Sequence, residues 1–376
     1  MVKVLHCADL HLDAPFVCGD VRKSELRRSE LLSTFSSMMN YVKHTGVDVV
    51  VISGDLFESE NVTRDTAAML QREFADNPMC RFVIAPGNHD PYTENGVYGK
   101  IKFPPNVYIF KSTAVSCFSF DDLNLDVYGY AFVNPVLEYN PFSNTRPNIN
   151  SRINILCAHG ELGVSKSSSC PITIDEIRAT GFDYVALGHI HAGSDVEKID
   201  DTFYAYSGCL EGRDFGECGY KGAILCEFEK EKYELKANFK KLRFCKRHYE
   251  IERVNVSGAQ NLSDVVSAVK SVIEEKQYSR DALVRVILEG DVSSELVISK
   301  SAFTSIEESL FYLEIVNKTR PFYDIDRLKN DPTIRGAFYE ELKPMLESED
   351  ENERQIAYSA LKYGLSALGG NNIVDF

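Results

Sequence analysis

The stretch DVVVISGDLF, residues 48–57, decides how this chain folds. Its first six residues form a short β-branched run that predicts a buried strand. Gly54 and Asp55 follow at once, and the glycine lets the backbone turn tightly so that the carboxylate lies at the end of the strand. The carboxyl ends of strands are where α/β sheets hold their functional sites. We therefore expect Asp55 to belong to a site.

Four further polar motifs follow predicted strands in the same way, and they hold five of the eight histidines. The predicted strands are residues 2–7, 48–53, 81–85, 152–158 and 183–187. The motifs are Asp9-Leu10-His11, Gly87-Asn88-His89-Asp90, the isolated His159, and Gly188-His189-Ile190-His191. If the segment of Asp9 and His11 is extended, both side chains point the same way and can bind one ion. The same spacing separates His189 and His191.

The pattern of strands and helices predicts a layered α/β domain over residues 1–248. Between the first two strands, apolar residues recur near the 3.6-residue period from Leu26 to Val42, and we expect Arg27 and Glu30 on the opposite, solvent face. A small α/β capping domain is expected over residues 249–320, with a helix at 262–273 and strands at 283–288 and 310–316. A helical segment is expected over residues 321–376.

Composition is that of a soluble globular protein, with 44% hydrophobic and 26% charged residues. No apolar run reaches the roughly 18 residues that a membrane-spanning helix needs, and the first strand begins directly after Met1, so we expect a cytoplasmic protein without membrane attachment. The ten cysteines form no C-x-x-C pair, which argues against a zinc ribbon and predicts free, mostly buried thiols. A homodimer is compatible with the sequence.

The net charge of −15 argues against non-specific coating of nucleic acid, which depends on neutralising many phosphates. Residues 236–247 are an exception, because they contain six basic residues and no acidic one. Two interpretations stay open. The stretch is either a solvated edge strand protected by its lysines or a surface that contacts phosphate.

The motifs supply imidazole nitrogens, carboxylate oxygens and one amide oxygen, a mixture that suits Mn, Fe or Zn. Two metals about 3.5 to 4 Å apart can clamp a phosphoryl group and activate a shared water. A carboxylate must then bridge them, and Asp55 is the natural candidate. Each motif alone is weak, but their order and their places at strand ends together predict a metal site.

This set of motifs closely resembles the calcineurin-like metallophosphoesterases over residues 1–250. The resemblance implies a layered β-sandwich flanked by helices. It also implies one metal held by Asp9, His11, Asp55 and His191, a second held by Asp55, Asn88, His159 and His189, and His89 as the catalytic residue. Both ions are expected to be divalent, with Mn²⁺ first.

The run from Ala8 to Asp13, together with residues 54–57, looks like the DNA repair exonucleases of the SbcD and YhaO type. That resemblance implies a DNA substrate and an SMC-like ATPase partner. The C-terminal helix carries an apolar stripe of Ile356, Ala360, Tyr363 and Ala367, and two interpretations stay open: the C-terminal helices dock the ATPase, or the stripe packs back on the capping domain. Some nucleases of this group carry a substrate-contacting histidine where this chain has Glu58, whose charge would repel phosphate. Arg213 lies in a glycine-rich segment and is a candidate phosphate contact, and Tyr92 could stack on a base.

We therefore expect a dinuclear-metal-dependent DNA nuclease that hydrolyses phosphodiester bonds with a metal-activated water, acting as a 3′ to 5′ exonuclease in DNA repair. One alternative is a phosphodiesterase of small molecules or cyclic nucleotides. Another is a non-catalytic, protein-binding scaffold on the same fold, which predicts lost ligands. The protein phosphatases are disfavoured, because residues 54–60 lack the arginine of their G-D-x-x-D-R-G motif.

Overall fold

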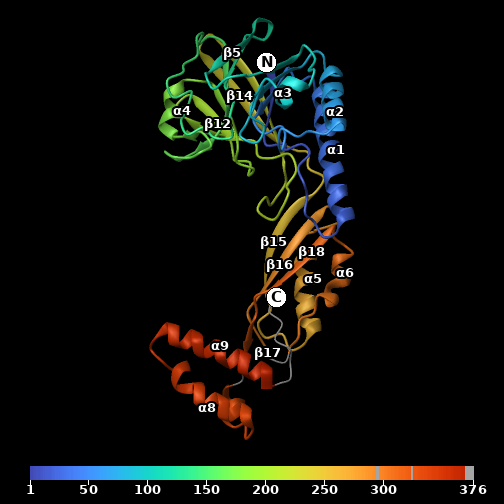
Figure 1. Cartoon of the computed structure of the whole chain (residues 1–376), viewed down its shortest axis with the longest axis vertical. Helices are drawn as coiled ribbons and strands as arrows, with labels where there is room; N and C mark the ends of the chain where they lie inside the picture. The colour runs from blue at the N-terminus through green and yellow to red at the C-terminus, as the bar shows by residue number, and fades with distance from the viewer. Residues whose placement is uncertain (294–295, 323–324, 369–376) are drawn as a thin grey trace. The chain divides into compact units, whose positions relative to one another are not determined.

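Two six-stranded mixed sheets form the centre of the N-terminal unit, which spans Met1–Tyr249 (Figure 1). The structure is a computed structural model that describes residues 1–293, 296–322 and 325–368. The first sheet has the order β14-β13-β1-β2-β3-β4, with β1 Val2–Cys7, β2 Val49–Ser53, β3 Arg81–Ala85, β4 Val107–Ile109, β13 Gly222–Glu231 and β14 Glu234–Arg243. The second has the order β11-β12-β10-β7-β6-β5, with β5 Ser116–Phe120, β6 Leu125–Gly129, β7 Ile153–His159, β10 Tyr184–Gly188, β11 Glu197–Ile199 and β12 Thr202–Tyr206.

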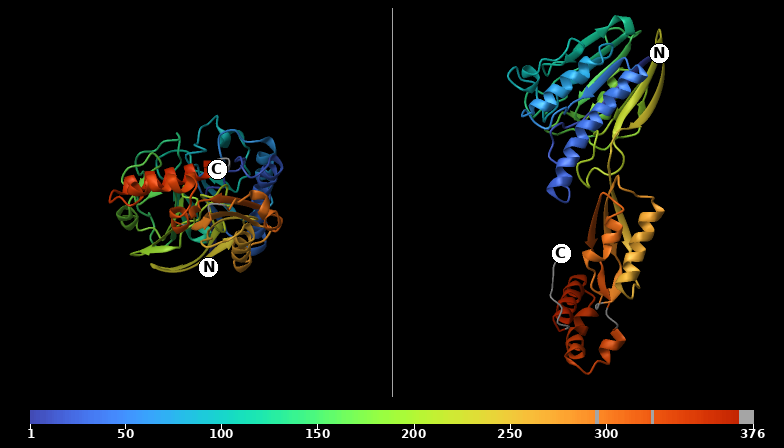
Figure 2. Two further views of the ribbon diagram at one scale, coloured as in Figure 1. Left: turned by 90° about the horizontal axis from the view of Figure 1, so that it is seen from below. Right: turned by 90° about the vertical axis from the view of Figure 1, so that its right-hand side faces the viewer.

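Helices cover the outer faces of this sandwich (Figure 2). Aliphatic side chains of both sheets, such as Val51 and Ile155, meet in one buried layer between them. Helices α1 (Val21–Thr45) and α2 (Arg64–Ala75) pack on the first sheet, and α4 (Ile174–Thr180) packs on the second. The remaining short elements are α3 Val97–Lys100, η1 Asp121–Leu123, β8 Glu161–Leu162 and β9 Pro171–Ile172. The predicted α/β sandwich flanked by helices is confirmed.

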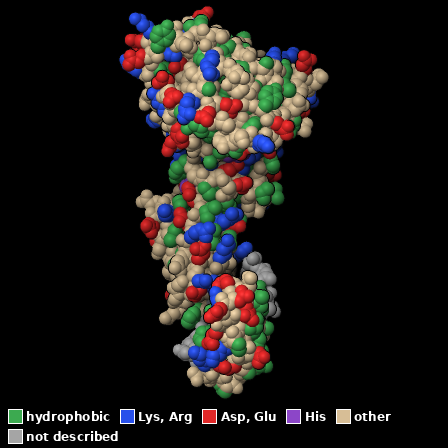
Figure 3. Space-filling view, turned by 90° about the vertical axis from the view of Figure 1, so that its left-hand side faces the viewer, with side chains coloured by type: hydrophobic (Ala, Val, Ile, Leu, Met, Phe, Trp, Pro, Cys, Tyr) green, Lys and Arg blue, Asp and Glu red, His purple; other side chains and the backbone are tan. Residues whose placement is uncertain are grey.

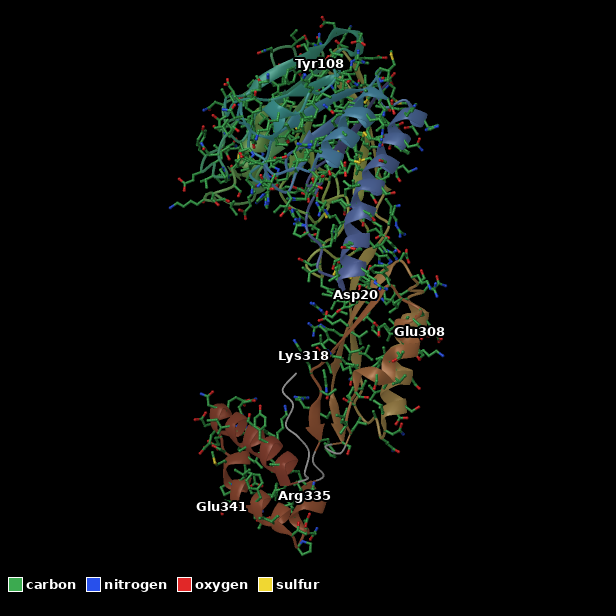
Figure 4. The ribbon with its side chains drawn as sticks, turned by 45° about the vertical axis from the view of Figure 1, so that its right-hand side comes forward. Asp20, Tyr108, Glu308, Lys318, Arg335 and Glu341 are labelled. Carbon is green, nitrogen blue, oxygen red and sulfur yellow. The ribbon has the colours of Figure 1, made fainter. Side chains whose placement is uncertain are left out.

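The predicted strands are present within one residue of their expected bounds, except that the strand expected at 310–316 begins two residues later, as β18 Tyr312–Asn317. The predicted helix α1 begins after Asp20, whose side chain accepts a hydrogen bond from the backbone N–H of Lys23 (Figure 4). It ends at Gly46, whose φ of 64° lies in the left-handed region that glycine adopts easily.

One prediction for α1 is wrong, because Arg27 and Glu30 are buried rather than on the solvent face. Arg27 Nη1 lies 2.9 Å from Glu30 Oε2, and its Nη2 lies 2.9 Å from Glu211 Oε2. Arg247 Nη2 lies 2.6 Å from Glu30 Oε1. Charged side chains are rarely buried unless they are paired, and two of the partners here, Glu211 and Arg247, lie far along the sequence.

The C-terminal unit, Glu250–Phe376, contains a three-stranded sheet of order β15-β16-β18 with its own apolar core. Its elements are β15 His248–Asn255, α5 Leu262–Glu275, β16 Ala282–Glu289, β17 Asp291–Ser293, η2 Lys300–Phe303, α6 Thr304–Glu307, β18 Tyr312–Asn317, β19 Arg320–Phe322, α7 Ile325–Lys329, α8 Ile334–Leu346 and α9 Glu351–Leu368. The further boundary expected near residue 320 stays a prediction. Part of the segment predicted from residue 321, namely 323–324 and 369–376, lies outside the described residues.

Helices α8 and α9 have a small core of their own. Tyr339 of α8 and Leu361 and Leu365 of α9 are buried together. A second apolar stripe of α9 remains outside, since Ile356 is 62% exposed and Tyr363 is 42% exposed. Arg335 and Glu341 mark α8 in Figure 4.

The surface carries interspersed charges of both signs on the face drawn in Figure 3. All ten cysteines are free, and eight of them are buried. Within the described part of the chain, no helix is both long and apolar enough to cross a membrane.

Candidate metal centre

The five motifs follow five strands whose carboxyl ends lie at one edge of the sandwich. β1, β2 and β3 are parallel neighbours in the first sheet, and β7 and β10 are parallel neighbours in the second. The two sheets also touch here, because His159 Nδ1 donates a hydrogen bond to the backbone oxygen of Ser53 over 2.9 Å. The sheet topology therefore collects all the predicted ligand residues in one place.

The loops of Asp9 and Asp55 are joined through their backbones. The N–H of Asp9 donates to the oxygen of Gly54 over 3.1 Å, and the N–H of His11 donates to the oxygen of Asp55 over 3.0 Å. Asp9, His11 and Asp55 have φ of 51°, 44° and 51°, so the expected extended segment is wrong. Left-handed backbone at residues other than glycine is costly, and proteins tolerate it mainly at functional sites.

Gly54 is required at its position for two reasons. Its φ is 92°, and a Cβ atom there would lie 2.0 Å from Nδ1 of His159. Gly87 has a similar role, because a Cβ there would lie 2.2 Å from Oδ1 of Asp55. Both glycines let the loops approach the side chains of the centre closely.

One group of donor atoms surrounds His11 and His191, whose Nε2 atoms lie 3.0 Å apart. Asp9 completes this group, with its ligand atom and those of the two histidines all within 4.8 Å. Oδ2 of Asp55 lies 3.7 Å from Nε2 of His11. Nitrogen and carboxylate atoms at this spacing can share one metal ion.

A second group of donor atoms includes His159, Asn88 and the same carboxylate of Asp55. Nε2 of His159 lies 3.4 Å from Oδ2 of Asp55 and 2.9 Å from Oδ1 of Asn88. The ring centroid of His189 is 5.3 Å from that of His159, and the backbone N–H of His189 donates to Asp9 Oδ1 over 2.9 Å. The same oxygen of Asp55 thus faces both groups.

The buried groups influence one another strongly. Burial alone would lower the pKa of His159, but the attraction of Asp55 outweighs burial and raises it to about 9. The pKa of Asp55 is lowered despite its burial, because His159 and His11 lie beside it. Burial lowers the pKa of His189 to about 4. The lowered pKa of Asp55 keeps its carboxylate negative, and the lowered pKa of His189 keeps its imidazole neutral. A negative carboxylate and a neutral imidazole are ligands that fit a divalent cation.

His89 lies at the rim, with 40% of its side chain exposed. Its backbone N–H donates to Oδ1 of Asp55 over 3.0 Å, and its Nδ1 lies 3.2 Å from the backbone oxygen of Glu58. The ring centroid is 4.8 Å from that of His11. The imidazole is therefore positioned beside the centre and remains open to solvent.

Asp90 joins the loop that follows β2 to the loop that follows β3 through hydrogen bonds. Its carboxylate accepts hydrogen bonds from the N–H of Phe57 over 3.0 Å, the N–H of Gly87 over 2.7 Å and the hydroxyl of Tyr98 over 2.6 Å. Burial and the charge of Asp55 raise its pKa, while these three hydrogen bonds oppose the shift. The side chain of Tyr98 is buried.

Arg213 lies between two carboxylates at the rim. Its Nη1 is 3.0 Å from Glu58 Oε2, and its Nη2 is 3.1 Å from Glu217 Oε1. Glu58 also approaches the centre, since its Oε2 lies 2.8 Å from Nδ1 of His11. Both residues predicted to affect substrate are thus beside the metal ligands. The guanidinium is already paired with protein carboxylates.

Sequence reasoning missed Glu217. Its Oε1 lies 2.5 Å from Nδ1 of His191, and its Oε2 accepts a hydrogen bond from the N–H of Arg213 over 2.8 Å. The signal that could have found it is an acidic residue four positions after Arg213 in the glycine-rich segment. That signal is weak, because sequence spacing does not show which histidine the carboxylate meets.

Tyr92 is half-buried. Its N–H donates to the oxygen of Phe132 over 2.7 Å, and Nζ of Lys111 lies 5.9 Å from its ring centroid. It lines a groove of about 610 Å³ that also includes Tyr108 and Phe118. Stacking of a base on Tyr92 stays a prediction.

Comparisons with known proteins agree with this geometry. The family described as calcineurin-like phosphoesterase matches residues 2–193. The chain is 28% identical over 300 residues to the uncharacterized metallophosphoesterase YhaO of Bacillus subtilis, which covers 76% of this chain and 71% of that protein. It is 24% identical over 251 residues to the DNA double-strand break repair protein Mre11 of Methanopyrus kandleri, which covers 61% of this chain and 54% of that protein.

Among solved structures, a double mutant of Vps29 from Entamoeba histolytica is similar to 64% of this chain and 98% of its own length. The sequence identity is 9% and the TM-score is 0.27, so the similarity between the two structures is weak. The chain spans about half the length of the Mre11 relative and somewhat more than two thirds of YhaO.

Proposed function

The chain belongs to the calcineurin-like phosphoesterase family, and we propose that it is a DNA nuclease that hydrolyses phosphodiester bonds with two divalent metal ions. The observation that carries the proposal is the position of Asp55, whose Oδ2 lies 3.7 Å from Nε2 of His11 and 3.4 Å from Nε2 of His159. One carboxylate that faces two groups of nitrogen and oxygen donors is the arrangement that a bridged pair of metals needs.

The residues divide into two ligand sets around this bridge. Asp9, His11, Asp55 and His191 would hold one ion, and Asp55, Asn88, His159 and His189 would hold the other. The mixed nitrogen and oxygen donors suit Mn, Fe or Zn, and the proposed metal is Mn²⁺ because the resemblance to the nuclease family implies it. When bound, the ions would supply a water of lowered pKa and offset the charge that develops on the phosphate.

His89 is the proposed general acid. Its backbone is held by Asp55, and a hydrogen bond from Nδ1 to the backbone oxygen of Glu58 leaves Nε2 for the substrate. From this position the imidazolium can give a proton to the leaving oxygen. Arg213 is the proposed phosphate contact. Its guanidinium must release Glu58 or Glu217 before it can bind a phosphate of the substrate.

DNA is the proposed substrate, and a 3′ to 5′ exonuclease activity in the cytoplasm is the proposed role. Support comes from the similarity to a protein named for repair of DNA double-strand breaks. The scaffold alternative is disfavoured, since it predicts lost ligands and all seven proposed ligand residues are present. A phosphodiesterase of small molecules is left as an outcome of the test.

The test compares substrates with purified protein and Mn²⁺. Linear DNA labelled at either end, circular single-stranded DNA and bis-p-nitrophenyl phosphate should be incubated with the wild type and with Asp55→Asn. We expect shortening of linear DNA from the 3′ end, and loss of both metals and of activity in Asp55→Asn. Cleavage of the small diester alone would favour the small-molecule alternative, and no cleavage with two metals bound would favour the scaffold.

An SMC-like ATPase is the proposed partner, docked by the exposed stripe of α9. An apolar stripe at helical spacing is suited to a groove on a partner. Ile356→Asp combined with Tyr363→Asp should abolish co-purification with the ATPase and leave DNA cleavage unchanged, because the buried stripe of Leu361 and Leu365 is retained. Retained co-purification would contradict this docking surface.

A further inference from the structure

A pocket of about 290 Å³ lies beside the loop that follows His191. Its walls are residues 192–194 of that loop, the start of β13 and the end of β14. Three of its lining residues are basic, namely Lys221, Lys241 and Arg243. Lys241 and Arg243 belong to the basic stretch 236–247, which supplies no ligand to the proposed metal centre.

Lys221 is the informative residue, because its side chain is buried without a countercharge. The residue is 6% exposed, and its Nζ lies 3.3 Å from the backbone oxygen of His191. Among the residues that the structure describes, Lys221 makes no ion pair. An ammonium group has three hydrogen-bond donors, and a buried charge is costly unless it is paired.

The other two basic residues add positive charge at the same place. The guanidinium of Arg243 lies 3.6 Å from the ring centroid of Tyr220, a contact that orients its planar group. Nζ of Lys241 lies 2.6 Å from Oδ1 of Asp195, and both of these side chains are exposed. Three cationic side chains therefore line one pocket, in a chain whose net charge is −15.

We propose that this pocket binds a phosphate group. A phosphate would supply the countercharge that Lys221 lacks and would match the planar donors of Arg243. The ring of Tyr220 is covered by Arg243 on one side and lies 4.4 Å from the ring of His248, so the pocket is not arranged to stack a base. The phosphate could belong to a mononucleotide or to a DNA strand, and the proposal concerns binding, which is separate from hydrolysis.

Binding of inorganic phosphate to the full chain tests the proposal, with EDTA present so that no metal ion contributes. Isothermal titration should show binding to the wild type that weakens by about tenfold or more in Lys221→Met and by a few fold in Arg243→Gln, as expected for lost charge-assisted hydrogen bonds. Lys240→Met is the matched control, because Lys240 is an exposed lysine of β14 that does not line the pocket. It should bind like the wild type.

Thermal unfolding gives a second measurement. Phosphate should raise the Tm of the wild type and of Lys240→Met, but not that of Lys221→Met, because a ligand stabilises only the protein that binds it. Without phosphate, Lys221→Met should be at least as stable as the wild type, since it removes an unpaired buried charge. If Lys221→Met does not fold, phosphate binding by Arg243→Gln is compared with that of the wild type instead.

The source of the phosphate is identified by the same variants. A 5′-mononucleotide and a single-stranded oligonucleotide without terminal phosphates should each be titrated in EDTA, and the compound whose affinity falls in Lys221→Met is the ligand. No phosphate binding to the wild type would overturn the proposal. Equal binding to all variants, or an equal loss in Lys240→Met, would overturn it as well.

Discussion

Glu217 contacts His191 directly, with Oε1 of the carboxylate 2.5 Å from Nδ1 of the imidazole. This contact directs Nε2 of His191 toward Nε2 of His11, which lies 3.0 Å away. A carboxylate that accepts a hydrogen bond from a metal-binding histidine fixes the tautomer and the orientation of the ring. Glu217 is therefore a positioning residue of the proposed metal centre.

Replacing Glu217 should weaken metal binding without changing the fold. We expect Glu217→Gln to lower the affinity for Mn²⁺ by about 10- to 100-fold, because the ring of His191 loses its charged partner. A metal titration followed by electron paramagnetic resonance measures this directly. Glu227→Gln, at a carboxylate of β13 that pairs with Asn238, is the control and should bind metal normally. Unchanged affinity in Glu217→Gln would remove the residue from this role.

His89 should act in catalysis and not in metal binding. His89→Ala is expected to keep its metal content and to slow DNA cleavage by about 10²- to 10⁴-fold, the usual effect of losing an acid-base group. Metal analysis and cleavage rates are measured on the same preparation. His159→Ala, at a proposed ligand, should lose metal instead. If His89→Ala also loses metal, the residue is a ligand and the assigned role is wrong.

Glu58 should restrain Arg213. Glu58→Gln removes one of the two carboxylates that pair with the guanidinium, so binding of single-stranded DNA should tighten by a few fold at low salt, which is the scale of a partly exposed ion pair. The gain should vanish in Glu58→Gln/Arg213→Gln. Glu60→Gln removes a nearby exposed charge and controls for the change in net charge. An equal gain in Glu60→Gln would show a general electrostatic effect.

Arg27 should be important for stability, because it pairs with the buried Glu211 and with Glu30. Arg27→Met should lower the free energy of unfolding by about 3 to 5 kcal/mol, since it leaves buried carboxylates without a partner. Denaturant unfolding measures the change. Arg28→Met, at the exposed neighbour, should have little effect. A loss recovered in Arg27→Met/Glu211→Gln would confirm that the unpaired charge is the cause.

The same cluster gives a direction for the pH dependence of stability. Burial opposes ionisation of Glu30, but the hydrogen bonds from Arg247 and Arg27 outweigh it and hold its pKa below the usual value of 4.5. A carboxyl group whose pKa is lower in the folded protein than in the unfolded chain stabilises the folded state, and this stabilisation is fully present above the unfolded-state pKa of about 4.5. The stabilisation is lost as the pH falls through the lower pKa of the folded protein. The loss of stability below about pH 4.5 should therefore be smaller in Glu30→Gln than in the wild type.

Much of the fold and of the site could be predicted from local sequence. Residues 48–53 read as a strand because β-branched residues favour one, and Asp55 follows where parallel strands share an edge. Sheet geometry places the motifs after β1, β2 and β3 at one edge of the first sheet and those after β7 and β10 at one edge of the second. The grouping of the predicted ligand residues within each sheet is thus a property of the sequence pattern, and the meeting of the two groups depends on how the sheets pack.

Other features depend on partners that are distant in the sequence. Arg27 has the sequence spacing of a solvent-facing residue. Only folding brings the carboxylate of Glu211 close enough to pair with the buried guanidinium and offset the cost of removing it from water. The loop of Asp9 and His11 is left-handed rather than extended, because its N–H groups bond to the backbone of Gly54 and Asp55.

The sequence by itself determined a layered α/β domain and the strand ends at which the histidines and carboxylates lie, because these follow from periodicity and strand order. The resemblance of its motifs to a known family implied the sandwich flanked by helices. Only the tertiary structure decided the partner of each side chain. Glu217 meets His191, Arg213 is paired with Glu58, and Lys221 is buried without a countercharge, since such contacts depend on how loops far apart in the chain pack together.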